Sequence, residues 1–218
     1  MKTMNGIVSN TEENVVPNRI LIFSPQTAAI LLNEKIGWGR FDFPRNKTEQ
    51  GGWMIGHHIT NGQGEIIKSE VQYILEAETD VREPGYIEWS ALEDIRLQRA
   101  FFTIQRSVAE TDPEAAKHLE LLGWWHTHPN RLHVFLSGTD RATIQSKFNK
   151  PGHYSVVLNP HQKTWRVFAG PDATEIHGFI PLPDATVTNK AVKDKKHNRG
   201  KWNKRKRKIS MKKQKRRR

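Results

Sequence analysis

The chain has 218 residues, no cysteine and a formal net charge of +12, and this length is enough for one domain with a hydrophobic core. The lack of cysteine excludes disulfides, a thiolate nucleophile, iron–sulfur clusters and cysteine-ligated zinc. Residues 190–218 contain 17 Lys/Arg and one acid, a net charge of +16, whereas the remaining 189 residues carry 18 basic and 22 acidic side chains. The sequence therefore predicts a mildly acidic domain followed by a basic tail.

The first residues lack the apolar run of a secretory signal, and no stretch reaches the length of a transmembrane helix. We therefore expect a soluble cytoplasmic protein, or a nuclear one in a eukaryotic cell, where the basic run resembles a nuclear localisation signal. The predicted segments are an N-terminal extension (1–18), one domain (19–185) and a disordered basic tail (186–218).

In chain order, alternating aliphatic residues first predict a strand that begins near Arg19. Ser24 and Pro25 then fit the N-cap and the first position of a helix that runs to Gly39. The next patterns predict strands over 51–60 and 65–78 and a loop over 80–86.

The second half of the chain begins with apolar residues at helical spacing, which predict a long helix over 90–110. A second helix is expected over 111–123, with Pro113 near its first turn and Gly123 at its end. The remaining patterns predict a strand at 124–128, a helix at 137–148 and strands at 154–160, 164–170 and 175–182. This mixed order indicates an α/β fold in which helices flank a curved mixed β-sheet, ending near residue 185.

The strand predicted at 124–128 carries His126 and His128. Residues i and i+2 of a strand point to the same face, so the two imidazoles can converge on one ion. Asp140 falls in the first turn of the next helix and completes a set of three ligands. Two histidines and a carboxylate are typical of catalytic zinc, which keeps a fourth position for water.

Other interpretations of these side chains remain open. Ser137 and Asp140 also fit a helix capping box, which needs no metal. His133 is an alternative third ligand, although loop tips are usually mobile and solvated. Adjacent strand residues face opposite ways, so at most one of His57 and His58 faces the site, and we expect at least one of the two tryptophans, Trp124 and Trp125, in the core.

The segments "HTHP" and "SGTD" together resemble the signature of the JAMM (MPN-plus) zinc metalloproteases. That family also has a glutamate ahead of a glycine-rich strand, and Glu49 precedes such a strand here. The resemblance covers about residues 19–183, with eight residues between His128 and Ser137 where the family commonly has seven. It implies the MPN/JAMM fold, which is cytidine-deaminase-like, and a stand-alone bacterial or phage-type member.

The resemblance also implies a chemistry for these residues. Zn²⁺ held by His126, His128 and Asp140 would activate a water molecule. Glu49 would move the proton, and Ser137 would donate a hydrogen bond to the oxyanion.

Active members typically cleave isopeptide or peptide bonds after the C-terminal diglycine of ubiquitin or a ubiquitin-like protein, so such a protein or its conjugates is the expected partner. We expect its extended tail to lie along a sheet edge at residues 51–56. A narrower related chemistry is release of an amino acid or peptide from a sulfur-carrier protein. The alternative is a non-catalytic MPN-type scaffold whose basic tail binds nucleic acid, although the complete ligand set and Glu49 argue against it.

Residues 190–218 have almost no apolar side chain to bury, which predicts disorder. Their charge favours nucleic-acid phosphates, through counterion release and without sequence preference, and Trp202 could stack on a base. Acidic protein surfaces and anionic membranes are the alternatives, but the tail lacks an apolar face for insertion.

Deletion of residues 190–218 should therefore abolish salt-dependent binding to DNA and RNA, because it removes a net charge of +16. Fluorescence anisotropy with labelled oligonucleotides at low salt measures this. An unchanged affinity after the deletion would reject the nucleic-acid hypothesis.

Overall fold

The computed structural model describes residues 6–9, 19–35, 48–78, 81–83 and 86–181. The chain divides into two units, Met1–Leu182 and Pro183–Arg218. The second unit and the predicted disorder of the tail lie outside the described residues. Within the described part of the chain, no helix has both the length and the apolar character that a membrane crossing requires.

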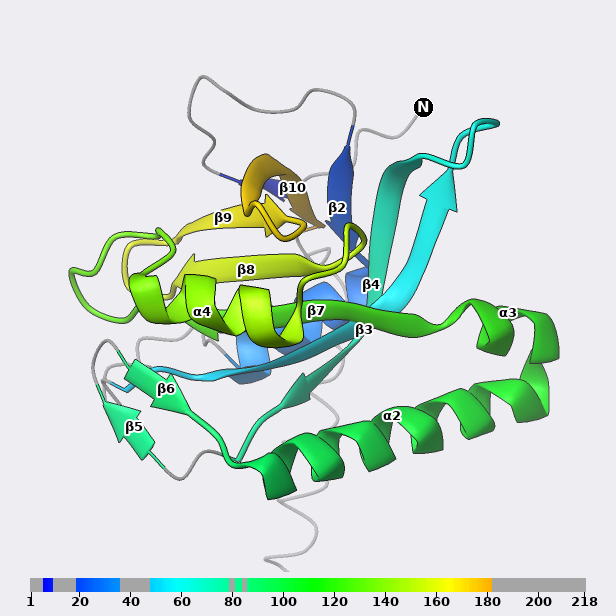
Figure 1. Ribbon diagram of the computed structural model, residues 1–218, viewed down its shortest axis with the longest axis horizontal. Helices are drawn as coiled ribbons and strands as arrows, with labels where there is room; N and C mark the ends of the chain where they lie inside the picture. Colours follow the sequence, from blue (N-terminus) through cyan, green and yellow to red (C-terminus); the bar gives the residue numbers. More distant parts are fainter. Residues whose placement is uncertain (1–5, 10–18, 36–47, 79–80, 84–85, 182–218) are drawn as a thin grey trace, which may run out of the picture. The chain divides into compact units, whose positions relative to one another are not determined.

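The elements follow one another in a mixed α/β order (Figure 1). The strands are β1 (Gly6–Val8), β2 (Ile20–Phe23), β3 (Gly51–Thr60), β4 (Ile66–Glu76), β5 (Val81–Glu83), β6 (Tyr86–Glu88), β7 (Glu120–Thr127), β8 (Tyr154–Asn159), β9 (Thr164–Ala169) and β10 (Thr174–Pro181). The helices are α1 (Pro25–Ala29), the π-helical turn η1 (Ile30–Lys35), α2 (Ala91–Thr111), α3 (Pro113–His118) and α4 (Gly138–Lys147).

Eight strands form one mixed sheet in the order β1-β10-β2-β4-β3-β7-β8-β9. The pairs β10–β2, β2–β4 and β7–β8 are parallel, and the other pairs are antiparallel. Because β9 also pairs with β10, the sheet curves until its far end meets β10. Figure 1 shows α4 in front of β7 and β8, and the long α2 running beside the sheet. The structure therefore confirms the predicted α/β class, a mixed sheet with flanking helices.

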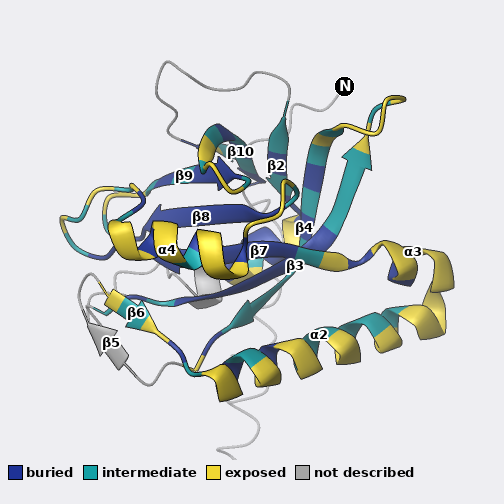
Figure 2. Cartoon of the chain, viewed as in Figure 1, coloured by how far each residue is buried: buried dark blue, intermediate teal, exposed yellow. Residues whose placement is uncertain are grey.

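Alternate side chains of each strand point to opposite faces of the sheet and pack into the core. Figure 2 shows the central strands as the most buried part of the described chain. The main cluster joins Trp125, Trp165 and Tyr154 to residues of α1 and η1. Trp124 points to the other face of β7 and packs with Leu97 of α2 in a second cluster. Both tryptophans are therefore buried, as the strand pattern predicts for at least one of them.

The predicted helix over 111–123 is wrong beyond His118, where α3 ends. The strand β7 begins at Glu120, because pairing with both β3 and β8 overrides the helix propensity of this segment. Gly123 does not end a helix but lies inside β7 with φ of +131°. A side chain there is excluded, since a Cβ atom would lie 2.0 Å from the carbonyl oxygen of Tyr154.

Several short elements differ from the predicted ones. Ser24 caps α1 as predicted, but the helix continues as a π-helical turn, and the predicted residues 36–39 lie outside the described residues. The expected loop over 80–86 contains β5 and the start of β6, which pair with each other. The strand β1 lies in the expected N-terminal extension and pairs with β10. Strands of three residues are too short to show a periodicity in the sequence.

The prediction that residues 51–56 form a sheet edge is also wrong. The strand β3 is an inner strand: Gly51 pairs with His126, and Gly52 pairs with both Trp125 and Glu76. Gly52 permits this close pairing, because a Cβ atom would lie 1.8 Å from the carbonyl oxygen of Leu75. No further strand can therefore add at these residues.

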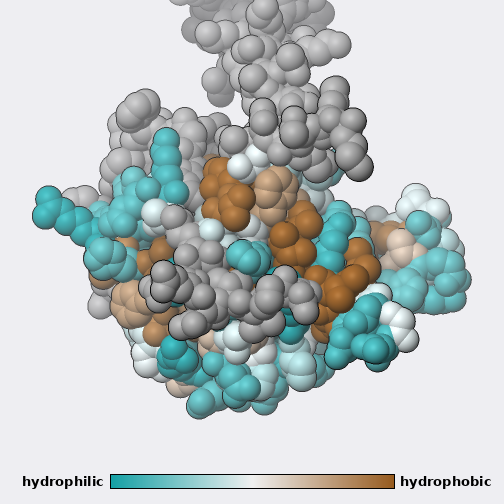
Figure 3. Space-filling model, turned by 90° about the horizontal axis from the view of Figure 1, so that it is seen from above, coloured by the Kyte–Doolittle hydropathy of each residue, from teal (hydrophilic) through white to brown (hydrophobic). Residues whose placement is uncertain are grey.

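The surface of the domain is not uniformly polar, and Figure 3 shows hydrophobic residues gathered in a band between hydrophilic ones. Single exposed apolar side chains are usual on globular proteins. The large apolar side chains that are exposed among the described residues are Val8, Ile30, Ile67, Tyr86, Leu92, Ile95, Phe102 and Phe135.

A polar network links β3, β4 and β8 in the interior. His58 Nδ1 lies 2.6 Å from Ser69 Oγ, which in turn lies 2.6 Å from the hydroxyl of Tyr154. Arg19 Nε donates to the same hydroxyl at 2.8 Å. Burial lowers the pKa of His58 to about 4, and the charge of Arg19 acts in the same direction. His58 is therefore a neutral, structural histidine at physiological pH.

His58 should make the fold less stable in mild acid. Its pKa is about 4 in the folded protein against an ordinary 6.5, so the unfolded chain binds more protons between these values. The contribution of His58 to the free energy of unfolding is therefore fully present above about pH 6.5. It falls as the pH drops towards 4, by about 2 kcal/mol at pH 5. Chemical denaturation across this range should show a flatter pH dependence for His58→Gln, which does not titrate. Parallel curves for the two proteins would contradict this assignment.

Candidate metal centre

The site lies where β7 ends and α4 begins. His126 and His128 lie two residues apart at the end of β7, and the backbone N–H of His128 still donates to the carbonyl of Leu158 in β8 at 2.8 Å. Asp140 lies in the first turn of α4, whose N-cap is Ser137. The end of a strand and the start of a helix thus bring three side chains together, as the sequence predicts.

The predicted capping box at the start of α4 is confirmed. The backbone N–H of Asp140 donates to Ser137 Oγ at 3.1 Å, and the N–H of Ser137 donates to Asp140 Oδ2 at 2.7 Å. This exchange fixes the carboxylate of Asp140, because it holds one oxygen at the helix terminus. The other oxygen, Oδ1, lies 3.3 Å from His126 Nε2. The capping role and a ligand role are therefore compatible.

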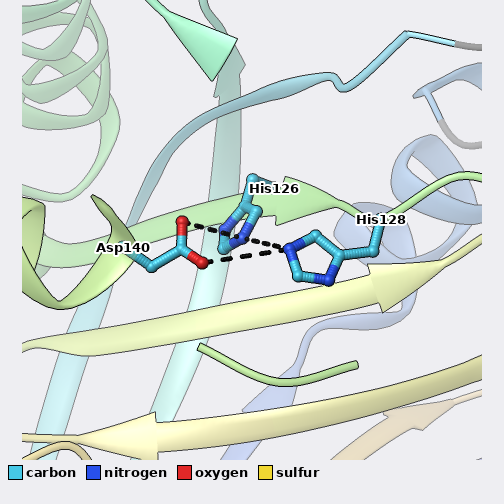
Figure 4. Close-up of side chains that lie close together, drawn as sticks. All are labelled: His126, His128 and Asp140. Carbon is cyan, nitrogen blue, oxygen red and sulfur yellow. Dashed lines mark hydrogen bonds and ion pairs between the residues drawn. The ribbon is translucent and has the colours of Figure 1, made fainter. Parts of the chain in front are cut away.

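The three side chains point toward one another, as Figure 4 shows. The two histidine Nε2 atoms are 3.2 Å apart, and His128 Nε2 lies 3.9 Å from Asp140 Oδ2. One ligand atom from each of the three residues lies within 4.8 Å of the others, and all three residues are buried. His126, His128 and Asp140 thus form a group that can hold a metal ion.

The chemistry of these donors fits a divalent cation such as zinc. His128 Nδ1 faces the carbonyl oxygen of His133 at 2.6 Å; a carbonyl only accepts, so Nδ1 carries the proton and Nε2 has a free lone pair. Burial, and then the charge of His126, lowers the pKa of His128, which favours the neutral form that binds metals. Burial raises the pKa of Asp140, but the charge of His126 and hydrogen bonds from His126 and Ser137 outweigh it and leave the pKa below the ordinary value. Two imidazoles and one carboxylate are a zinc ligand set.

Glu49 reaches this group through an extension of the β3–β7 ladder. Thr127 N donates to the carbonyl of Gln50 at 2.8 Å, and Gln50 N donates to Thr127 Oγ1 at 2.9 Å. This pairing places the carboxyl of Glu49 beside the histidines, with Oε1 3.9 Å from His128 Nε2.

The environment of Glu49 favours proton transfer. The residue is 3% exposed, and its Oε1 is buried without a hydrogen-bond partner among the described residues. Burial raises its pKa to about 7; the charge of His126 lowers the pKa and that of Asp140 raises it. A carboxyl with such a pKa gains and loses protons readily near neutral pH.

The other candidate histidines do not join the group. His133 is exposed, and its carbonyl rather than its side chain contacts His128. His57 and His58 lie on β3 beyond the pair Gly56–Glu120, away from the end of β3 that pairs with His126. Neither of these two faces the site, in agreement with the prediction that at most one could.

Two contacts around His128 were not predicted from the sequence. The exposed ring of Phe135 lies edge-on to the ring of His128, with the centroids 5.3 Å apart, and the His133 carbonyl accepts from Nδ1. Both groups come from the loop between β7 and α4. No spacing rule could predict them, because the loop has no regular periodicity and one contact uses a backbone atom.

Comparison with known proteins agrees with this geometry. Residues 40–169, more than half of the chain, match the family described as prokaryotic homologs of the JAB domain. The chain belongs to that family. This confirms the JAMM/MPN-like resemblance at the level of the domain, and the JAB match includes Glu49, Ser137 and the three buried residues of the metal-type group. A search of the curated proteins finds no match.

The JAB domain should bind about one zinc ion per chain. Elemental analysis of zinc-supplemented protein without a histidine tag should find this stoichiometry in the wild type, in Glu49→Gln and in His133→Ala. Asp140→Ala should lose the metal.

Asp140→Asn is the matched control for the cap, because its side-chain oxygen can still accept from Ser137 N while the negative charge is gone. It should keep the folded state better than Asp140→Ala and still bind zinc weakly. Full zinc occupancy in both Asp140 variants would exclude Asp140 as a ligand.

Proposed function

We propose that this JAB-domain chain is a zinc-dependent hydrolase that cleaves isopeptide or peptide bonds at the C-terminus of ubiquitin or a ubiquitin-like protein. The observation that supports hydrolysis best is Glu49, a buried carboxyl beside the His–His–Asp group, whose Oε1 has no hydrogen-bond partner in the described part of the chain. A structural metal site would not need a fourth, titratable side chain there. Perturbed carboxyl groups in such positions are typical of catalytic acids and bases.

His126, His128 and Asp140 would hold the zinc ion, which when bound supplies Lewis acidity and lowers the pKa of a water molecule. With three protein ligands, the site would leave room for a water molecule on the ion, as catalytic zinc sites do. Asp140 contributes a negative charge, because its pKa is held below the ordinary value.

Glu49 would accept a proton from the attacking water and return it to the departing amine. Its pKa of about 7 suits both steps, since a group that titrates near the working pH exchanges protons in either direction. Burial keeps bulk water away from the carboxyl. Thr127 and Gln50 hold the backbone that carries it.

Ser137 would donate a hydrogen bond to the oxyanion. Its Oγ accepts the N–H of Asp140 at 3.1 Å, and a hydroxyl that accepts one hydrogen bond still has its own proton to donate. Ser137 is only half-buried, so a substrate can reach it. The side chain of Ser137 can thus cap α4 and contact an oxyanion at the same time.

The substrate class rests on the resemblance of the "HTHP" and "SGTD" segments to active JAMM proteases. Phe135, exposed beside His128, offers an apolar contact to the chain that carries the scissile bond. The basic residues 190–218 are proposed to bring the enzyme to targets on nucleic acid, because their net charge of +16 matches a phosphate backbone.

Glu49→Gln separates catalysis from metal binding. The substitution preserves size but removes proton transfer, so we expect about 10²–10⁴-fold slower cleavage at unchanged zinc content. Ubiquitin and ubiquitin-like proteins extended at the C-terminus by a peptide or an isopeptide-linked lysine serve as substrates, with products measured by mass spectrometry.

The alternative function, a non-catalytic MPN-type scaffold, gives a different result. In that case zinc-loaded wild type and zinc-loaded Glu49→Gln would be equally inactive on every C-terminal derivative. Equal, measurable rates for the two proteins would instead reject Glu49 as the acid–base residue.

A further inference from the structure

The loop of residues 129–136, between β7 and α4, decides how His128 is oriented. Its His133 carbonyl accepts a hydrogen bond from His128 Nδ1 at 2.6 Å, and its Phe135 ring packs against the His128 ring. The carbonyl selects the tautomer in which Nε2 carries the free lone pair. A histidine ligand depends on such a second contact for both its tautomer and its ring angle.

The loop has little regular structure of its own to hold this carbonyl in place. Asn130 has a positive φ of 64°, and Arg131, His133 and Phe135 are exposed. Within the loop, Leu132 N donates to the Pro129 carbonyl at a long 3.4 Å. The position of His133 must therefore be set by contacts from another part of the domain.

Asn159, the last residue of β8, supplies two of these contacts. Its Nδ2 donates to the carbonyl of Asn130 at 3.2 Å and to that of Leu132 at 2.6 Å. Its Oδ1 accepts from the backbone N–H groups of His161 and Gln162 at 2.9 and 2.7 Å. Only this orientation of the amide satisfies all four partners, and the residue is fully buried.

The side chain of Asn159 thus joins two backbone segments, the loop after β7 and the turn after β8. On one side it holds the turn after β8, and on the other it holds the carbonyl of Leu132, the residue directly before His133. The same turn makes a second contact, since Asn130 N donates to His161 Nδ1 at 2.6 Å. The link from Asn159 to His128 is therefore short: one amide, one loop residue and one carbonyl.

We propose that Asn159 is a positioning residue for the metal centre, which holds the His133 carbonyl so that His128 presents Nε2 to the metal. This rests on the proposed function in one respect, that the His–His–Asp group binds zinc. The amide is needed because both loop partners are carbonyls, and only a side chain with two donors and an acceptor serves both segments. Asn159 touches neither metal nor substrate and acts through the loop.

Asn159→Asp is the sharpest test, because it keeps the size and the acceptor but replaces both donors with a carboxylate oxygen. We expect zinc affinity to fall about 10–100-fold, as for other residues that orient metal ligands. The affinity is measured by competition with a chromogenic chelator. Gln162→Ala is the matched control, since it removes only a 3.4 Å bond to the Asn130 carbonyl and should leave the affinity unchanged.

The tautomer of His128 gives a readout that depends on neither zinc nor activity. Long-range ¹H–¹⁵N spectra of the metal-free wild type should show the Nδ1-protonated form, and Asn159→Asp should show a mixture of tautomers or the Nε2-protonated form. If the wild type binds no zinc but the substitution shifts the tautomer, the proposed function and the metal-centre role of Asn159 both fail, and only the orientation of His128 by Asn159 stands.

A folded Asn159→Asp with the wild-type tautomer and zinc affinity overturns the proposal. Asn159→Ser, which retains a single donor, serves if the aspartate variant does not fold, and its tautomer and affinity should lie between those of wild type and a complete loss. If neither variant folds, Asn159 is required for folding and the positioning role is rejected.

Discussion

The pairing of β7 with both β3 and β8 is the constraint on which the site depends. The β3 side brings Glu49 to the histidines, through the ladder that ends at Gly51 and the extra bonds between Thr127 and Gln50. The β8 side holds the N–H of His128 and carries Asn159 at its end. A shift of one residue in either register would turn the histidines to the opposite face, so the buried tryptophans that fix the register also fix the site.

Burying two imidazoles and two carboxyl groups so close together costs free energy unless their charges are balanced. For Asp140, the hydrogen bonds of the capping box and the contact with His126 offset the cost of burial, and the carboxylate stays ionised. The Oε1 atom of Glu49 has no hydrogen-bond partner among the described residues, and burial raises the pKa of Glu49 to about 7. Two carboxyl groups in one site are thereby driven to different protonation behaviour, which suits one for holding a cation and the other for moving protons.

Rigidity at the site comes from hydrogen bonds to irregular backbone. The loop of residues 129–136 has an exposed surface, yet it is bonded to Asn159, His161 and Arg166 of the β8–β9 hairpin. This allows a loop to present both the carbonyl of His133 and the ring of Phe135 to His128. Such backbone bonds are also the part of the structure that a change of loop length affects first, and this loop is one residue longer than the common JAMM spacing.

The resemblance to the JAMM signature pointed to Glu49. The sequence by itself determined the mixed α/β class, the placement of His126 and His128 on one face of a strand, and the capped helix that carries Asp140. These follow from local rules: strand alternation, helix capping and a motif with fixed spacing. Tertiary structure alone decided that Leu119–Gly123 is not helical, that residues 51–56 lie inside the sheet and that Asn159 reaches the loop. Those outcomes depend on pairing between distant segments, and the local pattern of one sequence does not indicate which strands become neighbours.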